Sequence, residues 1–236
     1  MRTRAIVLAV TAALLLAGLV TLPERPAAAA TTTAGQVVVV SAPTSTSTYA
    51  TVDAYTRQPD GRYRRMAHFT SARIGSAGMG VASETVARTP VGQFRLGQGF
   101  GVRANPGAGV PYFQVTRDDV WTGSTGSVIN EHRRCAPGTC PASYGNYEQL
   151  INYPGPYAYA AFIGYNAPPT YGTGAVAGAG SAFFMHVKNA SATGGCVAVS
   201  ESEMLWILRW MKSSLTPIVS IGVGAAPYLI MPNRYI

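Results

Sequence analysis

Two residues that can carry out nucleophilic chemistry stand ten positions apart near the C-terminal end, His186 and Cys196. Only a thiolate attacks well, and a thiol near its usual pKa of about 8.5 is mostly protonated at neutral pH. A neighbouring imidazole would take that proton. Gly194 and Gly195 directly precede the cysteine and let the backbone turn sharply, which exposes the sulfur. We therefore predict that Cys196 is a nucleophile and His186 its general base.

Acyl transfer also needs groups that stabilise negative charge. The backbone amides of Gly195 and Cys196 are candidates for an oxyanion site, an effect usually worth several kcal/mol. Residue types alone leave a second interpretation open, in which Cys196 is a small buried hydrophobe beside a core histidine. An unpaired thiol in an exported protein risks oxidation or wrong pairing, so export would favour a use for this cysteine.

The first thirty residues have the composition of a secretory signal. Arg2 and Arg4 precede an apolar run over residues 5–20, and small residues occupy positions 27–30. A basic start, a short hydrophobic stretch and an A-x-A site are the parts of a signal peptide. A transmembrane anchor is the alternative, but the run is at the short limit for spanning a bilayer. We predict a signal peptide over residues 1–30, a secreted protein and no stable membrane insertion after cleavage.

The chain has three cysteines, and two of them are close in sequence. Cys135 and Cys140 flank four residues with a Pro-Gly pair, which suits a tight turn, and an oxidising compartment would let them form a small disulfide. Free thiols or a metal site are the alternatives, but His132 is the nearby histidine and a second ligand pair is missing. We favour the disulfide, which leaves Cys196 unpaired, and we predict neither a metal nor a cofactor.

Short β-favouring pieces separated by glycines dominate the remainder of the chain. Alternating segments at Tyr49–Arg57 and residues 63–69 surround Asp60-Gly61, the strongest local hairpin signal. A further strand is expected over residues 157–165. Such a pattern predicts a mainly β domain with few helices, either sandwich-like or barrel-like.

One helix interrupts the β pattern. Ser200 and Glu203 form a capping-box pair, and apolar residues recur at helical spacing over residues 201–212. Residues 31–48 are a linker or a first strand, and residues 49–236 form the single domain that a chain of 236 residues with 47% hydrophobic content can support. We expect this domain to be a monomer.

The formal net charge of +8 favours polyanionic surroundings. The basic residues are scattered apart from Arg62, Arg64 and Arg65, so we expect no nucleic-acid binding. Glu148 either pairs with a basic residue or binds a substrate amine, and the sequence does not decide between these roles.

Four short segments together resemble a known family. Residues 184–186 (Phe-Met-His) and 193–197 (Thr-Gly-Gly-Cys-Val) resemble the catalytic motif of the L,D-transpeptidase catalytic domain of the YkuD type. Residues 89–94 (Thr-Pro-Val-Gly-Gln-Phe) look like the family's Thr-Pro-x-Gly-x-Phe element, and residues 180–182 (Gly-Ser-Ala) resemble its lead into the histidine. The resemblance implies a mixed, β-sandwich-like catalytic domain with few helices.

The resemblance also implies an enzyme of peptidoglycan that contributes to cell-wall biogenesis and cell shape. Cys196 would attack a stem tetrapeptide after its third, diamino acid residue, release D-alanine and form a thioester, with His186 as general base. An amine of another stem, or water, would resolve the thioester. By position, Gly195 and Gly194 would belong to the oxyanion or substrate site and Thr193 would support the motif.

Two features depart from the family pattern. Ala198 stands where many members have Arg or Asn, and the six residues between His186 and Thr193 are typical of a short-loop branch. Both leave open a non-catalytic cell-wall-binding domain with the same fold. A secreted cysteine peptidase of another family is a third hypothesis, which the motif disfavours.

Overall fold

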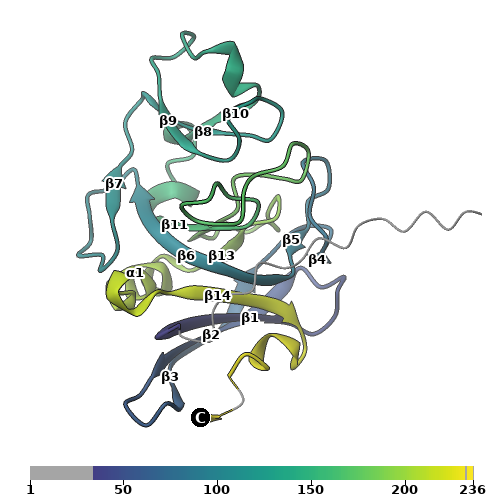
Figure 1. Cartoon of the computed structure of the whole chain (residues 1–236), viewed down its shortest axis with the longest axis vertical. Helices are drawn as coiled ribbons and strands as arrows, with labels where there is room; N and C mark the ends of the chain where they lie inside the picture. The colour runs from purple at the N-terminus through teal and green to yellow at the C-terminus, as the bar shows by residue number, and fades with distance from the viewer. Residues whose placement is uncertain (1–33, 232, 236) are drawn as a thin grey trace, which may run out of the picture.

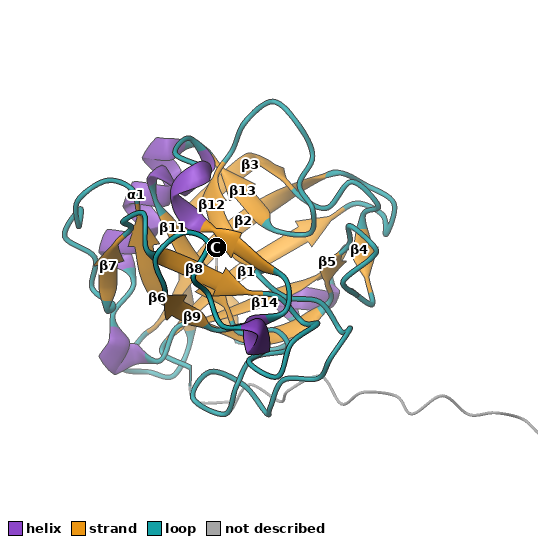
Figure 2. Ribbon diagram, turned by 90° about the horizontal axis from the view of Figure 1, so that it is seen from above, coloured by secondary structure: helices purple, strands orange, loops and turns teal. Residues whose placement is uncertain are grey.

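The protein is described by a computed structural model over residues 34–231 and 233–235, so the signal peptide predicted over residues 1–30 lies outside the described residues. The described chain is mainly β, with one α-helix and short 3-10 turns around a large sheet (Figure 1, Figure 2). This confirms the predicted fold class. No helix among the described residues is long and apolar enough to cross a membrane.

The described strands range from two to 11 residues in length, and loops connect many of them. In chain order they are β1 (Gln36–Ala42), β2 (Tyr49–Arg57), β3 (Tyr63–Arg73), β4 (Met79–Gly80), β5 (Thr89–Pro90), β6 (Gly92–Gly101), β7 (Tyr112–Gln114), β8 (Asp119–Thr122), β9 (His132–Arg134), β10 (Tyr147–Gln149), β11 (Ala160–Ile163), β12 (Phe184–Val187), β13 (Val197–Val199), β14 (Ile218–Val223) and β15 (Arg234–Tyr235). The helical elements are η1 (Ala142–Tyr144), η2 (Leu150–Asn152), η3 (Pro156–Ala158), α1 (Glu201–Trp210), η4 (Ser213–Leu215) and η5 (Ala226–Tyr228).

The large sheet closes on itself and is barrel-like. Its strand order is β11-β12-β13-β3-β2-β1-β14-β6-β7, and β11 also pairs with β6. The pairing is mixed, because β1 with β14 and β12 with β13 run parallel while β2 and β3 run antiparallel. The β11–β6 pairing gives β11 a second partner besides β12, which removes the exposed edge that an open sheet would leave at β11.

The valine run ahead of Tyr49 is an interior strand of this sheet. β1 pairs with β2 on one side and with β14 on the other. Residues 37–40 are fully buried, and alternate valines belong to two different hydrophobic clusters. A strand covered on both faces reads as a continuous apolar run rather than as an alternation. Of the two interpretations of residues 31–48, the strand therefore applies to Gln36–Ala42.

The predicted hairpin and the predicted helix are both present. β2 and β3 pair antiparallel around a turn in which Gly61 has φ +82°, a conformation that favours glycine. α1 begins after Ser200, whose hydroxyl accepts a hydrogen bond from the Glu203 amide in a capping box. The helix ends at Trp210, two residues before the predicted end.

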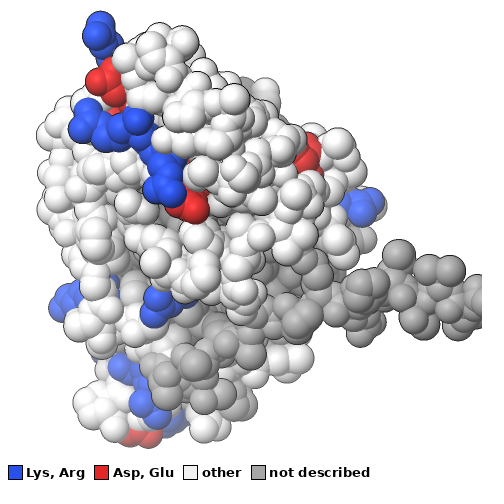
Figure 3. Space-filling view, turned by 45° about the horizontal axis from the view of Figure 1, so that its top comes forward, with Lys and Arg blue, Asp and Glu red and all other residues white. Residues whose placement is uncertain are grey.

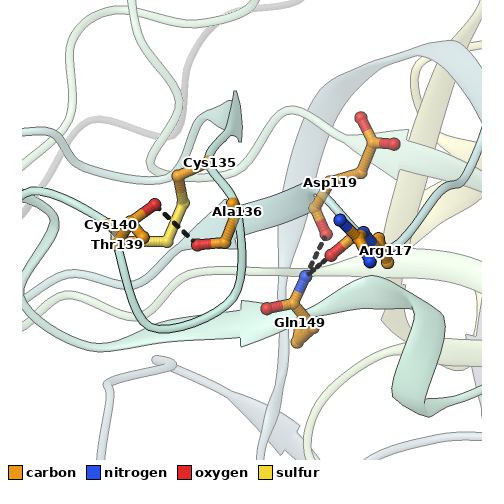
Figure 4. Close-up of a disulfide and its surroundings, with 7 residues drawn as sticks. All are labelled: Arg117, Asp119, Cys135, Ala136, Thr139, Cys140 and Gln149. Carbon is orange, nitrogen blue, oxygen red and sulfur yellow. Dashed lines mark hydrogen bonds between the residues drawn. A yellow bond between two sulfur atoms is a disulfide. The ribbon is translucent and has the colours of Figure 1, made fainter.

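A second, three-stranded sheet in the order β10-β8-β9 forms a lobe beside the barrel (Figure 1). We call residues 119–149 the disulfide lobe, because Cys135 and Cys140 are bonded there with their Cα atoms 5.1 Å apart (Figure 4). Its Trp121 packs edge-on against Phe184 of β12, with ring centroids 4.9 Å apart. The lobe is thereby fixed next to the strand that carries His186.

Charged side chains lie in separate groups on the surface, and several basic residues stand beside acidic ones (Figure 3). Around the disulfide lobe, Arg117 pairs with Asp118 and Arg134 pairs with Asp119, at 3.5 Å and 3.4 Å. The Arg117–Asp118 pair is exposed and contributes little to stability, whereas the Asp119 side chain is buried.

Candidate active site

Neighbouring parallel strands position the two predicted catalytic residues. His186 lies on β12, and Cys196 is the residue directly before β13. In the register of the pair, Met185 lies opposite Val197 and His186 opposite Ala198. Cys196 therefore lies level with Phe184, and the Phe184 amide donates a hydrogen bond to its Sγ at 3.4 Å.

The Cys196 thiol is half-buried and makes a second hydrogen bond. It donates to the Ala182 carbonyl, with 3.3 Å between Sγ and oxygen. Burial raises the pKa of this thiol to about 12, the nearby Glu148 carboxylate adds to the rise, and the Phe184 amide opposes it. The resting group is thus a neutral thiol at physiological pH.

The His186 imidazole is buried and has one defined nitrogen. Its Nδ1 lies 2.9 Å from the Val187 carbonyl oxygen, which can only accept, so Nδ1 carries the proton. Nε2 is then the free base of the neutral ring. Burial lowers the pKa of His186 below its ordinary value, with the bond to Val187 opposing the change. The imidazole is therefore neutral at pH 7 and able to accept a proton.

Cys196 and His186 line the same cavity, which has a volume of about 360 Å³. Thr193 and Gly194 of the predicted set line it too, together with Tyr157 and Glu148. Within the described part of the chain, neither hydrogen bond of the thiol involves His186. The two groups thus share one solvent space without a direct bond in this state.

Thr193 holds the loop of residues 193–196, which we call the nucleophile loop. Its hydroxyl donates to the Cys196 carbonyl at 2.7 Å and accepts from the Gly195 amide at 3.1 Å. The Gly195 amide, predicted as an oxyanion donor, is thus already engaged by Thr193. The Cys196 amide is left as the stronger oxyanion candidate of the two.

The two glycines of this loop differ in their surroundings. Gly195 has φ +138°, and a Cβ there would lie 2.5 Å from Phe183 Cε1 and 2.8 Å from the Arg88 carbonyl oxygen. Gly194 is exposed, and a Cβ there would meet no atom within 4 Å. Packing therefore requires glycine at position 195 and not at position 194.

The Thr-Pro element a hundred residues upstream touches the same loop. Thr89 is fully buried, accepts a hydrogen bond from the Gly75 amide at 2.9 Å and donates to the Cys196 carbonyl at 3.5 Å. A β-bridge also joins Gly75 to Thr193. The two motif segments are thus parts of one structure around the nucleophile.

Two cavity residues were not assigned a definite role by sequence reasoning. The Tyr157 hydroxyl donates to Glu148 Oε1 at 2.9 Å, and the Tyr157 ring meets the His186 ring edge-on at 5.8 Å. Burial raises the pKa of Glu148, and the Tyr157 bond opposes the rise. For Glu148 the structure gives a tyrosine as hydrogen-bond partner; among the described residues it forms no ion pair.

The other histidines and Ala198 take part in different contacts. His68 binds Asp53 at 2.7 Å, and His132 binds Asp119 at 2.8 Å while stacking on Phe113. Among the described residues, no group of three His, Cys, Asp or Glu side chains is placed to hold a metal ion. Ala198 is buried in β13, so its position offers no polar contact to the cavity.

The fold and this cavity define a class of protein: a closed, mixed β domain with a thiol and an imidazole on adjacent strands. The family model of the L,D-transpeptidase catalytic domain, YkuD, matches residues 29–219. The chain belongs to this family, as its motifs predicted. The match supports a function of the L,D-transpeptidase type on peptidoglycan.

Comparison with curated proteins gives no match. Among solved structures, the chain is similar to the helical cell shape determining protein Pgp2 from Campylobacter jejuni, with 15% identity and a TM-score of 0.39. The match covers 80% of this chain and 47% of that chain. The chain therefore spans about half the length of that protein.

Proposed function

We propose that the protein is a cysteine acyl-transferase that attacks peptidoglycan stem tetrapeptides after their third, diamino acid residue. Cys196 forms a thioester with that residue, D-alanine leaves, and the acyl group passes to an amine of another stem or to water. The observation that carries this proposal is the single cavity lined by both Cys196 and His186 in a chain of the L,D-transpeptidase family.

The first half of the reaction begins from a neutral pair. Burial disfavours both the thiolate and the imidazolium, so proton transfer accompanies attack instead of preceding it. The Cys196 proton moves to His186 Nε2 while Sγ bonds to the carbonyl carbon of the third residue. The bond to the D-alanine nitrogen then breaks, and His186 returns the proton to that nitrogen.

The second half regenerates the enzyme. The acceptor nitrogen bonds to the thioester carbon and gives a proton to His186 Nε2. The carbon-sulfur bond breaks, and Sγ takes the proton back. With a stem amine as acceptor the product is a crosslink between third residues, and with water it is a free carboxylic acid. The Cys196 amide is the candidate donor to the oxyanion in both steps.

The same proposal includes export through residues 1–30, a monomeric state, and a folded domain in which a strand within residues 31–48 joins residues 49–236. The Cys135–Cys140 disulfide supports an oxidising, extracytoplasmic location, since such bonds are rare in reducing compartments. Because β1 belongs to the main sheet, we place the start of the folded domain before residue 36.

A non-catalytic cell-wall-binding domain is the second candidate. The raised pKa of Cys196 and its bond to the Ala182 carbonyl favour it, because both describe an unreactive thiol. Slow alkylation by iodoacetamide would fit either function, since a resting neutral thiol reacts slowly in both. Turnover of a substrate is therefore the discriminating observation.

Release of D-alanine from a purified tetrapeptide stem tests the proposal. We expect wild-type protein to release it and Cys196→Ala to release it at least about a thousandfold more slowly, because the nucleophile is gone. Glu201→Gln, which changes a residue that lines neither cavity, is the control and should retain release. Equal release by wild type and Cys196→Ala, or none by wild type, would reject the enzyme function.

A further inference from the structure

A second cavity, of about 410 Å³, adjoins the one that holds the nucleophile. The two cavities have common walls, formed by Glu148, Ser181, Ala182, Phe183 and Gly194. Ala182 is also the residue whose carbonyl accepts the Cys196 thiol hydrogen bond. A substrate group that reacts at Sγ can thus extend past this wall into the second cavity.

The side chain of Glu84 lines this second cavity and is held by neutral donors. Ser124 Oγ donates to its Oε2 at 2.6 Å, and Ser181 Oγ donates to the same oxygen at 3.0 Å. Asn146 Nδ2 donates to Oε1 at 2.6 Å. These three residues come from three separate segments of the chain, so the carboxylate is fixed in one orientation.

The carboxylate of Glu84 is ionised, and its hydrogen-bond partners among the described residues are neutral. Burial raises its pKa, but the hydrogen bonds from Ser124, Asn146 and Ser181 outweigh burial, and the net change is a lowering. No ion pair between described residues includes Glu84. Among the described residues that line this cavity, the other charged one is Glu148, and none is Lys or Arg. In a basic protein, the cavity is therefore an acidic one.

We propose that Glu84 binds the side-chain ammonium group of a diamino acid residue of the stem peptide, and so determines specificity in the reaction proposed above. A primary ammonium keeps its proton at neutral pH and supplies three donors to an oriented carboxylate. A charge-assisted bond of this kind is stronger than one between neutral groups.

The position of Glu84 relative to the nucleophile fits a side chain of this kind. Ser181 bonds Glu84 and is followed directly by Ala182, which bonds Sγ. Adjacent Cα atoms are about 3.8 Å apart, so one residue step separates the two contacts. A substrate that contacts both Sγ and Glu84 would therefore run past two consecutive residues of one segment, Ser181 and Ala182.

The same ammonium chemistry occurs in two places. One is the third residue of the donor stem, whose carbonyl forms the thioester and whose side-chain ammonium does not react. The other is the third residue of the acceptor stem, whose amine docks before losing a proton and attacking. Either source would occupy the acidic cavity.

Binding to the Cys196→Ala protein tests the inference without turnover. Calorimetry would compare the tetrapeptide stem with the same peptide acetylated on its side-chain amine. We expect acetylation to weaken binding at least about tenfold, and Cys196→Ala/Glu84→Gln to bind the two peptides within about twofold of each other. A matched control, Cys196→Ala/Glu201→Gln, removes a carboxylate that pairs with Arg103 and lines neither cavity, and it should keep the preference.

Acetylation that changes affinity less than about twofold in Cys196→Ala would overturn the inference, as would a preference that survives Glu84→Gln undiminished. If Glu84→Gln does not fold, the acetylation comparison decides alone. In otherwise wild-type protein, slower D-alanine release into water by Glu84→Gln would show that Glu84 binds the ammonium of the donor stem. A loss of crosslinking alone would show that Glu84 binds the ammonium of the acceptor stem. Absence of D-alanine release with an intact binding preference would reject the proposed function and leave this inference standing.

Discussion

The nucleophile loop and the disulfide lobe are held in different ways. The loop is fixed by hydrogen bonds to Cys196: the Thr193 and Thr89 hydroxyls donate to its carbonyl, and the Phe184 amide donates to its Sγ. The lobe is a small three-stranded sheet with a half-buried disulfide, and its residues Asn146 and Glu148 line the second cavity.

The two regions contribute different groups, because the barrel carries the reacting groups and the lobe carries groups that can contact a substrate. The barrel strands β12 and β13 supply the thiol and the imidazole, while the lobe supplies polar groups that line both cavities. Groups on rigid elements keep the geometry that a reaction needs, whereas a small lobe can open locally without unfolding the barrel. Substitutions in the two regions should therefore have different consequences.

Gly195→Ala should have the largest effect, because the new Cβ would clash with Phe183 and with the Arg88 carbonyl in a backbone conformation unsuited to alanine. We expect the free energy of unfolding to fall by about 3 kcal/mol and D-alanine release to fall at least about a hundredfold. Urea unfolding and the release assay measure these changes.

Gly194→Ala is the matched control, since its Cβ would enter open space. It should change the free energy of unfolding by less than about 1 kcal/mol. Equal destabilisation by Gly195→Ala and Gly194→Ala would contradict the conclusion that packing requires glycine at position 195 and not at position 194.

Removal of the disulfide should act on the lobe alone. For a loop this short, Cys135→Ser/Cys140→Ser should destabilise the lobe by about 2 kcal/mol, because the open form gains chain entropy. Hydrogen exchange should become faster for amides of β8 to β10 and stay unchanged for amides of β12. Faster exchange in β12 as well would show that the lobe and the barrel open together. This would contradict the expectation that the lobe opens without the barrel.

The pH dependence of kcat/KM should reflect the buried pair and is the smallest of these effects. His186 must be neutral to accept a proton, and burial lowers its pKa, so activity should fall only below the ordinary value of about 6.5. The pKa of Cys196 at about 12 predicts no thiol ionisation between pH 7 and about 9. A midpoint of the acid limb above pH 6.5 would mean that His186 is not buried as a neutral base.

The features predicted correctly from the sequence are those that depend on neighbouring residues. The Asp60-Gly61 hairpin, the Ser200–Glu203 capping box and the strand that carries His186 all depend on residues a few positions apart. The strand predicted over residues 157–165 is shorter in the structure, where Pro156–Ala158 forms a 3-10 turn and β11 begins at Ala160. Proline at the start of such a turn is favourable, and the tertiary setting outweighed the β propensity of Tyr157.

Contacts formed by barrel closure could not be predicted in the same way. Glu84 meets Ser181, and Thr89 meets Cys196, across about a hundred residues of chain. The family motif placed Thr89 near the site by resemblance, but no spacing rule indicated Glu84 or the Tyr157–Glu148 pair. The engagement of the Gly195 amide by Thr193 is a further detail that residue types do not reveal.

The decisive step of the proposed reaction is the formation of a thioester between Cys196 and the third residue of a stem peptide. Intact-protein mass spectrometry on wild type mixed with tetrapeptide and quenched in acid would detect this intermediate. We predict an added mass equal to the stem tripeptide acyl group, mapped to Cys196 by digestion and missing in Cys196→Ala. D-alanine release without such an adduct on any quench timescale, or an adduct that persists in Cys196→Ala, would contradict the account.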